Sequence, residues 1–334
     1  MKTSLVITTI NKPNINIKKL INLSKKNKSK LIIIGDKKTP KNFKIQYGFF
    51  YNVINQKKLN FNFSKICPYN SYARKNIGYL ISIKDNMETI IETDDDNYPK
   101  NNFFNFLNPT YNVDEIDQKN WVNIYKKFLE KDLEIWPRGL PLDKINHLPN
   151  FKNKKVKKKF YLKQGVCEGN PDVDAIYRLI NDKIDIKFKN NYKFSLGKAF
   201  SPINSQNTIW SKKIFSLMYL PVTCTMRATD IWRGIIALNI ILNDNLGVLI
   251  FGTTMKQNRN IHNLKNDLNE EIPLFKDVQN AFLILKKLKL KKGSENYTKN
   301  LLKSYKALIN HEIFDKQELK YLNAWIKDIS VLKI

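Results

Sequence analysis

Short apolar runs alternate with longer amphipathic stretches in the first part of the chain. The β-branched runs at residues 5–10 and 31–34 each end in loop-forming residues, and the lysine-rich stretch at about 14–28 has helical periodicity. A strand, a helix and a strand at this spacing form a βαβ unit, whose crossover is almost always right-handed. The pattern therefore predicts an α/β fold whose sheet begins with parallel strands.

A second amphipathic helix is predicted within residues 68–87, which read PYNSYARKNIGYLISIKDNM. Apolar residues recur there at helical spacing, and Asn70 or Ser71 is placed to cap the helix. Arg74 and Lys75 fall in its first turn, where the helix dipole disfavours positive charge, so a nearby anion such as a pyrophosphate would explain them. The alternative is that both side chains only pair with surface carboxylates.

A third apolar run leads into the most acidic stretch of the chain. Ile90 and Ile91 predict a short buried strand, and three consecutive carboxylates, Asp94, Asp95 and Asp96, follow it. Burying them without partners would cost on the order of several kcal/mol each, so they need a cation or a solvated loop. Hard oxygen ligands at the carboxyl end of a parallel strand suit Mg²⁺ or Mn²⁺. A polar turn that caps a helix is the alternative.

The later part of the chain divides into the rest of this domain and a helical region. Residues 1–265 are predicted to form the α/β domain, with the weakly periodic residues at about 101–166 as an insertion. An apolar helix near the end of the domain would be capped by Thr229 or Asp230. Residues 266–334 are amphipathic and lysine-rich, so we expect a helical C-terminal extension that packs on the domain.

The large net charge of the chain does not by itself indicate a nucleic-acid partner. The chain has 58 basic and 30 acidic residues, a net charge of +28, which would ordinarily indicate a polyanionic partner. Most of the excess is scattered lysine, and only six of the basic residues are arginines. Each arginine lies in or beside a sequence motif, where a planar guanidinium suits a phosphate or a carboxylate. No specific nucleic-acid partner is therefore expected.

Cysteine usage and hydropathy favour a soluble, cytoplasmic protein. Three cysteines without CxxC spacing indicate neither a zinc site nor a disulfide framework, and they fit a reducing compartment. The first apolar run is too short for a signal peptide, and no apolar segment of about 18 residues occurs in the sequence. At most, the basic surface would hold the protein at the inner face of a membrane. The sequence does not indicate an oligomeric state.

Six motifs, in order along the chain, resemble one known family. They are similar to stretches of the glycosyltransferase-like domain of the STELLO proteins, over roughly residues 3–262: PYNSYARKNIGYL, TDDDN, WPRGLPL, GNPDVDAIYRL, SPINSQNTIW and TDIWRG. The acidic triplet itself is closer to that of the reversibly glycosylated polypeptides. The resemblance implies a GT-A fold, which is a Rossmann-like, mixed and mostly parallel sheet flanked by helices. It also implies a nucleotide-sugar donor and a divalent metal.

The same resemblance assigns roles to individual residues. It implies that Mn²⁺ or Mg²⁺ is held by Asp94 and Asp96, with His262 on a later polar loop as a third ligand. The donor, most simply a UDP-sugar, would be held by strand-end and basic residues: Thr8, Asp36, Arg74, Lys75, Asp95 and Arg233. Charge that builds on the leaving nucleoside diphosphate would be neutralised by the metal and these cations. The alternative for Asp36 is a structural Gly-Asp turn.

An inverting enzyme would also need a carboxylate base for the acceptor hydroxyl. Asp230 is the first candidate, with Asp172 and Asp174 behind it, while a retaining mechanism would need no such base. The acceptor would be a glycan or a lipid-linked compound of polysaccharide biosynthesis, and the transferred sugar a hexose or a pentose. The plant STELLO proteins carry a membrane anchor that is not expected here, and their acidic motif is not a clean DDD. Their location and acceptor are therefore not transferred.

Two other classes of function stay open at this point. Clustered aspartates in basic surroundings also occur in metal-dependent nucleotidyltransferases and nucleases, which would need a second acidic cluster. A non-enzymatic protein that binds nucleic acid or an anionic membrane would show aromatic residues interleaved with arginines on one surface. Neither feature is clear in the sequence.

Overall fold

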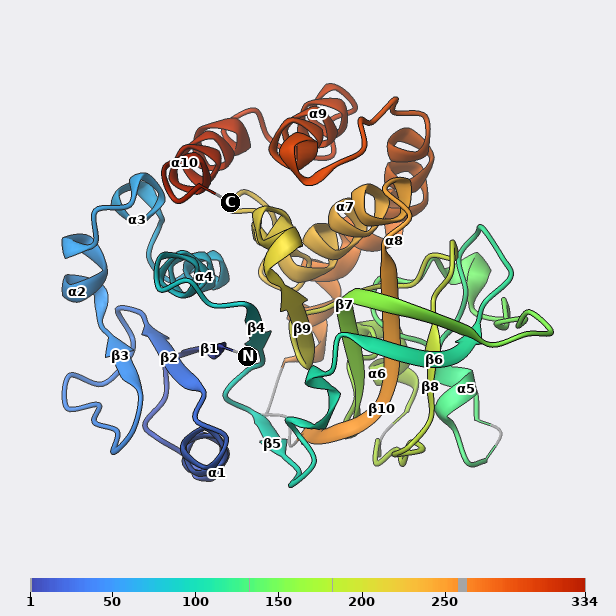
Figure 1. Cartoon of the computed structure of the whole chain (residues 1–334), viewed down its shortest axis with the longest axis horizontal. Helices are drawn as coiled ribbons and strands as arrows, with labels where there is room; N and C mark the ends of the chain where they lie inside the picture. Colours follow the sequence, from blue (N-terminus) through green and yellow to red (C-terminus); the bar gives the residue numbers. More distant parts are fainter. Residues whose placement is uncertain (1, 132, 182, 258–262, 334) are drawn as a thin grey trace.

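Residues 2–131, 133–181, 183–257 and 263–333 are described by the computed structural model. Within these ranges, one mixed β-sheet runs through the molecule in the order β3-β2-β1-β4-β9-β7-β6-β8-β10-β5, with helices on both faces (Figure 1). The mixed α/β fold expected from the sequence is confirmed, whereas the GT-A arrangement remains a prediction. No helix in the described part of the chain is long and apolar enough to cross a membrane.

Parallel strands form one half of this sheet. They are β1 (Thr3–Thr9), β2 (Lys30–Gly35), β3 (Phe49–Tyr51) and β4 (Thr89–Glu92). Val6 packs in the core that includes α4 (Lys75–Lys84), while its neighbour Leu5 packs in the core that includes α1 (Ile15–Lys26). Burial on both faces explains why these strands are continuous apolar runs in the sequence. The predicted strand, helix and strand at the amino terminus are confirmed.

The other half of the sheet is mixed and curls on itself. Its strands are β5 (Asn97–Pro99), β6 (Thr110–Glu115), β7 (Val156–Gly169), β8 (Lys193–Ser195), β9 (Thr208–Ser211) and β10 (Gly247–Gln257). β9 joins the two halves, because it pairs with both β4 and β7. β7 and β8 each pair with β6 and β10, so these four strands close into a ring. The predicted insertion at 101–166 thus contributes β6 and most of β7 to the sheet.

Most of the longer helices gather on one face of the sheet. In Figure 1, α8, α9 and α10 arc over α4 and α7, while α1 lies on the opposite face. The bounds of the remaining helices are α2 (Val53–Lys58), α3 (Asn62–Ile66), α5 (Tyr125–Phe128), α6 (Ala175–Ile180), α7 (Thr229–Asn243), α8 (Leu264–Lys286), α9 (Tyr297–Asn310) and α10 (Glu318–Val331). The expected C-terminal helices are therefore present, and they pack on helices from both halves of the chain.

Two buried carboxylates of α10 hold backbone amides of distant segments. Asp328 accepts hydrogen bonds from the backbone N–H groups of Asn62 and Phe63, both at 2.8 Å, at the start of α3. Glu318 accepts a hydrogen bond from the backbone N–H of Thr223 at 2.7 Å. The first N–H groups of a helix have no partner within the helix, so Asp328 acts as a cap supplied from the other end of the chain.

Candidate active site

A cavity of about 430 Å³ opens at the carboxyl ends of the parallel strands. Thr8 and Asp36 line it from the ends of β1 and β2, and the acidic triplet that follows β4 lines it beside them. Many of the residues singled out in the sequence therefore meet in one place. Its lining includes Thr8, Asp36, Arg74, Asp94, Asp95, Asp96, Asp172 and Asp230.

Asp94 is the carboxylate of the triplet that faces a buried cation. Its Oδ1 accepts hydrogen bonds from Lys75 Nζ at 2.7 Å and from the Tyr72 hydroxyl at 2.6 Å. Burial raises the pKa of Asp94, and the positive charge of Lys75 opposes that shift. Lys75 is itself fully buried, so the two charges compensate each other. The predicted donor-binding lysine is thus already a partner of the triplet.

The other two carboxylates of the triplet point elsewhere. Asp95 Oδ2 accepts hydrogen bonds from Thr9 Oγ1 at 2.5 Å and from Asn11 Nδ2 at 3.0 Å, which ties the triplet to the loop after β1. Asp96 Oδ2 accepts a hydrogen bond from Gln257 Nε2 at 3.0 Å, at the end of β10. The three adjacent side chains therefore avoid mutual repulsion by facing three different groups of partners.

The triplet offers a metal ion two carboxylates rather than a complete set of ligands. Within the described ranges, no cluster of three or more Cys, His, Asp or Glu side chains is arranged to hold a metal. His262, the predicted third ligand, lies outside the described residues. Mg²⁺ is usually bound through one or two carboxylates together with substrate phosphates and water. Asp94 and Asp96 are the carboxylates that a cation bound in this way would use.

Arg74 has a structural function in the loop before α4. Its Nε donates to Gln56 Oε1 at 2.9 Å, and its Nη1 donates to the backbone carbonyls of Cys67 and Pro68 at 3.1 and 3.0 Å. Arg74 is 2% exposed, so a diphosphate would have to compete with these partners. Ser71, one of the two expected caps, occupies the capping position of the 3₁₀ turn that leads into α4, although its side chain makes no capping hydrogen bond. A 3₁₀ turn over Tyr72–Arg74 intervenes, so the helix begins at Lys75 with Arg74 in the capping position.

Arg138 organises the acidic side of the cavity. Its Nε and Nη2 form a bidentate pair with Asp172, at 2.8 and 2.9 Å, and its Nη2 also lies 3.2 Å from Asp230 Oδ1. The side chain of Asp230 is therefore drawn toward Arg138. The predicted capping role of Thr229 or Asp230 is wrong, because Ala228 occupies the capping position of α7 and no side chain caps it. Asp172 and Asp230, two candidate bases, are held side by side by one guanidinium.

Arg233 lies in the core beneath the cavity, where it is 1% exposed. Its guanidinium pairs with Glu92, at 2.9 Å from Nη1 to Oε2 and 2.8 Å from Nη2 to Oε1. Glu92, at the end of β4, also accepts hydrogen bonds from Trp210 Nε1 at 2.7 Å and from the Tyr79 hydroxyl. Contact with a donor would require Arg233 to leave this pair. In the structure, the pair fixes the strand that presents the acidic triplet.

Asp174 is fully buried and caps α6. Its Oδ1 accepts a hydrogen bond from the backbone N–H of Tyr177 at 2.8 Å, and its Oδ2 accepts one from Trp136 Nε1 at 2.6 Å. Burial raises the pKa of Asp174 to about 6, although both hydrogen bonds oppose the shift. A base in this position would first have to exchange its partners for an acceptor hydroxyl.

The Asp174→Asn variant is expected to gain stability relative to the parent chain as pH rises. The pKa of Asp174 is about 6 in the folded state against an ordinary 3.8, so the folded state binds the proton more tightly. The contribution of this carboxyl to stability therefore falls as pH rises from about 4 to about 6, by at most about 3 kcal/mol. Urea unfolding at pH 4, 5, 6 and 7 measures the difference between variant and parent. A difference that is constant with pH would contradict the shift.

Several functional side chains have little signal in the sequence. Tyr72, Ser205 and Gln257 contact the candidate residues directly, yet none belongs to a residue type that marks a site by itself. Arg138 stands in WPRGLPL, and its position in a motif was the available signal. Glu92 lies just before the triplet, and the sequence alone does not distinguish a structural carboxylate there from a fourth acidic metal ligand. Their roles depend on partners that are distant along the chain.

Two curated proteins are similar to this chain. No protein-family model matches the chain. The chain is 25% identical over 329 residues to the probable glycosyltransferase STELLO1 of Arabidopsis thaliana, which covers 90% of this chain and 41% of that protein. It is 29% identical over 226 residues to the probable glycosyltransferase STELLO2 of the same plant, which covers 61% of this chain and 29% of that protein. The chain therefore spans less than half the length of either relative.

Proposed function

We propose that this chain, whose resemblance to the STELLO proteins is confirmed by these relatives, is a glycosyltransferase that uses a nucleotide-sugar donor. The names of the relatives support the class of enzyme. The cavity at the carboxyl ends of parallel strands supports a donor site of the GT-A kind, because open α/β sheets bind nucleotides there. Thr8 and Asp36 would contact the nucleoside, and the triplet would face the diphosphate.

The charge of the cavity lining is the observation that supports a requirement for a divalent metal in donor binding. Eight acidic and four basic side chains line the cavity in the described part of a chain whose net charge is +28. Three of the four basic residues are arginines that already donate hydrogen bonds to protein groups. Arg74 donates to loop carbonyls, Arg138 to Asp172, and Arg227 to Glu271. A bare diphosphate would meet repulsion here, whereas a diphosphate with a divalent cation would not.

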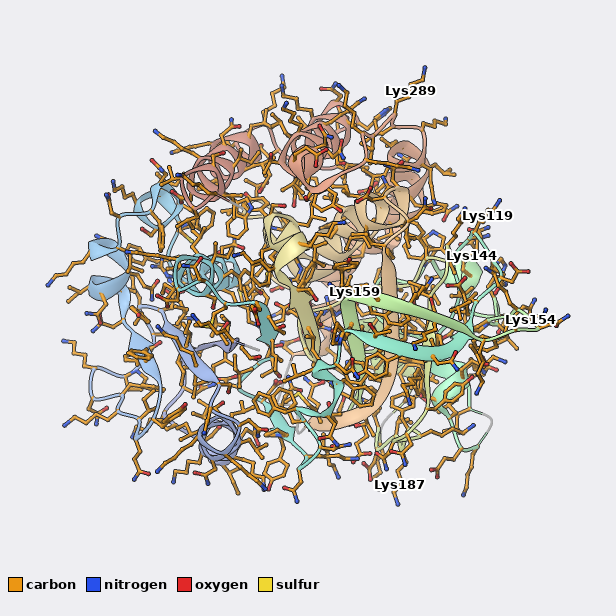
Figure 2. The ribbon with its side chains drawn as sticks, viewed as in Figure 1. Lys119, Lys144, Lys154, Lys159, Lys187 and Lys289 are labelled. Carbon is orange, nitrogen blue, oxygen red and sulfur yellow. The ribbon has the colours of Figure 1, made fainter. Side chains whose placement is uncertain are left out.

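Most of the lysines that give the chain its charge lie outside the cavity lining, which includes Lys38. Figure 2 shows Lys119, Lys154, Lys187 and Lys289 projecting outward from different sides of the ribbon. Such scattered charge supports solubility and weak contact with an anionic membrane surface. The proposed partners are therefore a nucleotide-sugar, most simply a UDP-sugar, and a glycan or lipid-linked acceptor. We also propose a cytoplasmic location.

The contacts in the cavity suggest a role for each residue in the proposed reaction. When bound, Mn²⁺ or Mg²⁺ would neutralise the charge that develops on the leaving diphosphate. Asp94 and Asp96 would hold it, and Lys75 would keep Asp94 in place. On the opposite side of the cavity, Asp230 would accept the proton of the acceptor hydroxyl, while Arg138 fixes its orientation. This assignment makes the enzyme an inverting transferase.

Binding of UDP is expected to require Mn²⁺, and Asp96→Asn is expected to weaken that binding roughly tenfold or more because a charge-assisted ligand is lost. Asp94→Asn should have the same effect, although it also leaves Lys75 buried without its counter-charge. Calorimetry with UDP, with and without Mn²⁺, measures both changes, and melting curves check the fold. Asp143→Asn, at an exposed carboxylate paired with Lys144, is the matched control and should bind as the parent does.

Two results would count against this function. If UDP binds the parent equally well without a divalent cation, the metal is not part of the donor site. If both variants at Asp94 and Asp96 bind Mn²⁺ and UDP as tightly as the parent, the triplet is not the metal site. Stabilisation by an oligonucleotide, but by neither UDP nor GDP sugars, would favour a nucleic-acid-binding protein instead.

A further inference from the structure

Two hydroxyl groups join the two charged clusters of the cavity. On the donor side, the Tyr72 hydroxyl donates to Asp94 Oδ1 at 2.6 Å and accepts from Lys75 Nζ at 2.8 Å. On the acceptor side, Ser205 Oγ lies 3.2 Å from Asp230 Oδ2, which also accepts the backbone N–H of Ser205 at 3.1 Å. The hydroxyls of Tyr72 and Ser205 are hydrogen-bonded to each other. A continuous chain of contacts therefore runs from Lys75 to Asp230.

The number of protons in this chain limits which contacts form together. Three contacts need a hydroxyl proton: Tyr72 with Asp94, Tyr72 with Ser205, and Ser205 with Asp230. Tyr72 and Ser205 each carry one hydroxyl proton, so two of the three contacts can be made at any time. The protons from Lys75 and from the Ser205 backbone are already directed at Tyr72 and Asp230. The hydroxyl pair therefore has alternative arrangements that differ in which carboxylate it serves.

In the first arrangement, Tyr72 donates to Asp94, and Ser205 donates to Tyr72. Asp230 then keeps the backbone N–H of Ser205 and its contacts with Arg138. In the second arrangement, Tyr72 donates to Ser205, and Ser205 donates to Asp230. Asp94 then keeps its ion pair with Lys75 but loses the hydrogen bond from Tyr72. A third combination, in which both hydroxyls donate to carboxylates, is disfavoured because it leaves the two hydroxyl oxygens in close contact without a proton between them. The choice between the first two arrangements depends on how strongly Asp94 attracts the tyrosine proton.

We infer that Tyr72 and Ser205 are positioning residues, through which a cation held by Asp94 on the donor side turns the Ser205 hydroxyl toward Asp230 on the acceptor side. A cation beside Asp94 competes with Tyr72 for the carboxylate and repels the tyrosine proton, so it favours the second arrangement. The acceptor-side carboxylate then gains a second hydrogen bond from Ser205 when the donor is bound. This inference rests on the proposed role of Asp94 in holding a cation.

The two hydroxyls should act on cation binding in opposite directions. Tyr72→Phe removes the proton that competes for Asp94, so the affinity for Mn²⁺ with UDP should rise by roughly three- to tenfold. Ser205→Ala removes the alternative acceptor for that proton, so the affinity should fall by a similar factor, although no contact between Ser205 and the triplet is present among the described residues. The double variant should match Tyr72→Phe alone, because Ser205 acts on Asp94 only through Tyr72.

Calorimetric titration of the chain with Mn²⁺ in the presence of UDP measures these affinities, and melting curves confirm that each variant is folded. Ser201→Ala is the matched control. Ser201 is also fully buried on the same segment, but its hydroxyl has no hydrogen-bond partner within the described ranges. We expect it to bind as the parent does. Opposite signs for Tyr72→Phe and Ser205→Ala, together with a double variant that matches Tyr72→Phe, would support the inference.

Other outcomes overturn it in distinguishable ways. If both single substitutions weaken binding, or if their effects add, the hydroxyls are ordinary structural contacts. If Ser205→Ala binds as Ser201→Ala does, the chain of contacts transmits nothing between the two sides. Should the parent itself fail to bind Mn²⁺ with UDP, the proposed donor site is wrong and this inference fails with it.

Discussion

Replacing Asp230 with asparagine is expected to lower turnover by about 10²- to 10⁴-fold while donor binding persists, because a general base is lost and the proposed metal ligands Asp94 and Asp96 are unchanged. The structure indicates that this substitution leaves the neighbouring contacts largely unchanged. Asp230 does not cap α7, and an asparagine oxygen can still accept the backbone N–H of Ser205, which now lies 3.1 Å away. Arg138 keeps its bidentate pair with Asp172. Sugar transfer, or slow hydrolysis of the donor, measures the loss.

Asp172→Asn is the matched control for this prediction. Asp172 shares the same arginine and lines the same cavity, so its substitution disturbs the local charge in a similar way. If Asp230 is the base, Asp172→Asn should retain much more activity than Asp230→Asn. The two activities are compared under conditions in which melting curves show both variants to be folded. An active Asp230→Asn enzyme ends the assignment. It would direct the search to Asp172 and Asp174, or to a retaining mechanism without this base.

Loss of the Arg233 guanidinium is expected to destabilise the fold by roughly 3–5 kcal/mol, since Glu92 would be left as an uncompensated charge in the core. Arg233→Met keeps much of the volume of the side chain. Both partners are almost completely buried, at 1% and 0% side-chain exposure. Urea unfolding measures the change in the free energy of unfolding.

The combined variant Arg233→Met with Glu92→Gln separates the charge from the volume. It removes both charges, and Gln can still accept a hydrogen bond from Trp210 Nε1. We therefore expect it to be clearly more stable than Arg233→Met alone. If Arg233→Met costs less than about 1 kcal/mol, water or another cation already compensates Glu92, and the pair does not hold β4 in place.

The parallel half of the fold was predictable because its signals are local. Strands covered on both faces need several consecutive apolar side chains, so residues 5–7 and 31–34 show their structure within a few residues. The position of the triplet followed from the same logic, since Ile90 and Ile91 lead into it. Which residues share a strand end depends on short-range periodicity and on the geometry of parallel sheets.

The partners of the charged residues were not predictable, because they are set by long-range contacts. Arg138 and Asp230 are 92 residues apart, and Arg233 and Glu92 are 141 residues apart. A guanidinium suits a phosphate and a carboxylate equally well, so a motif arginine alone does not indicate which one it binds. The two helix starts differ from the expectation by a few residues, because each start depends on the local backbone conformation. A 3₁₀ turn with Ser71 at its capping position precedes α4, and α7 begins at Thr229 with Ala228 in the capping position.

The cap that α10 supplies to α3 has a consequence for the order in which the protein is made. Asn62 leaves the ribosome 266 residues before Asp328, the residue that accepts its backbone N–H. At about 5–20 residues per second, this interval lasts from about ten seconds to a minute. Phe61, which precedes α3, makes no side-chain hydrogen bond to the helix start. The α3 segment of the nascent chain should therefore stay open to proteases until the last helix has been synthesised.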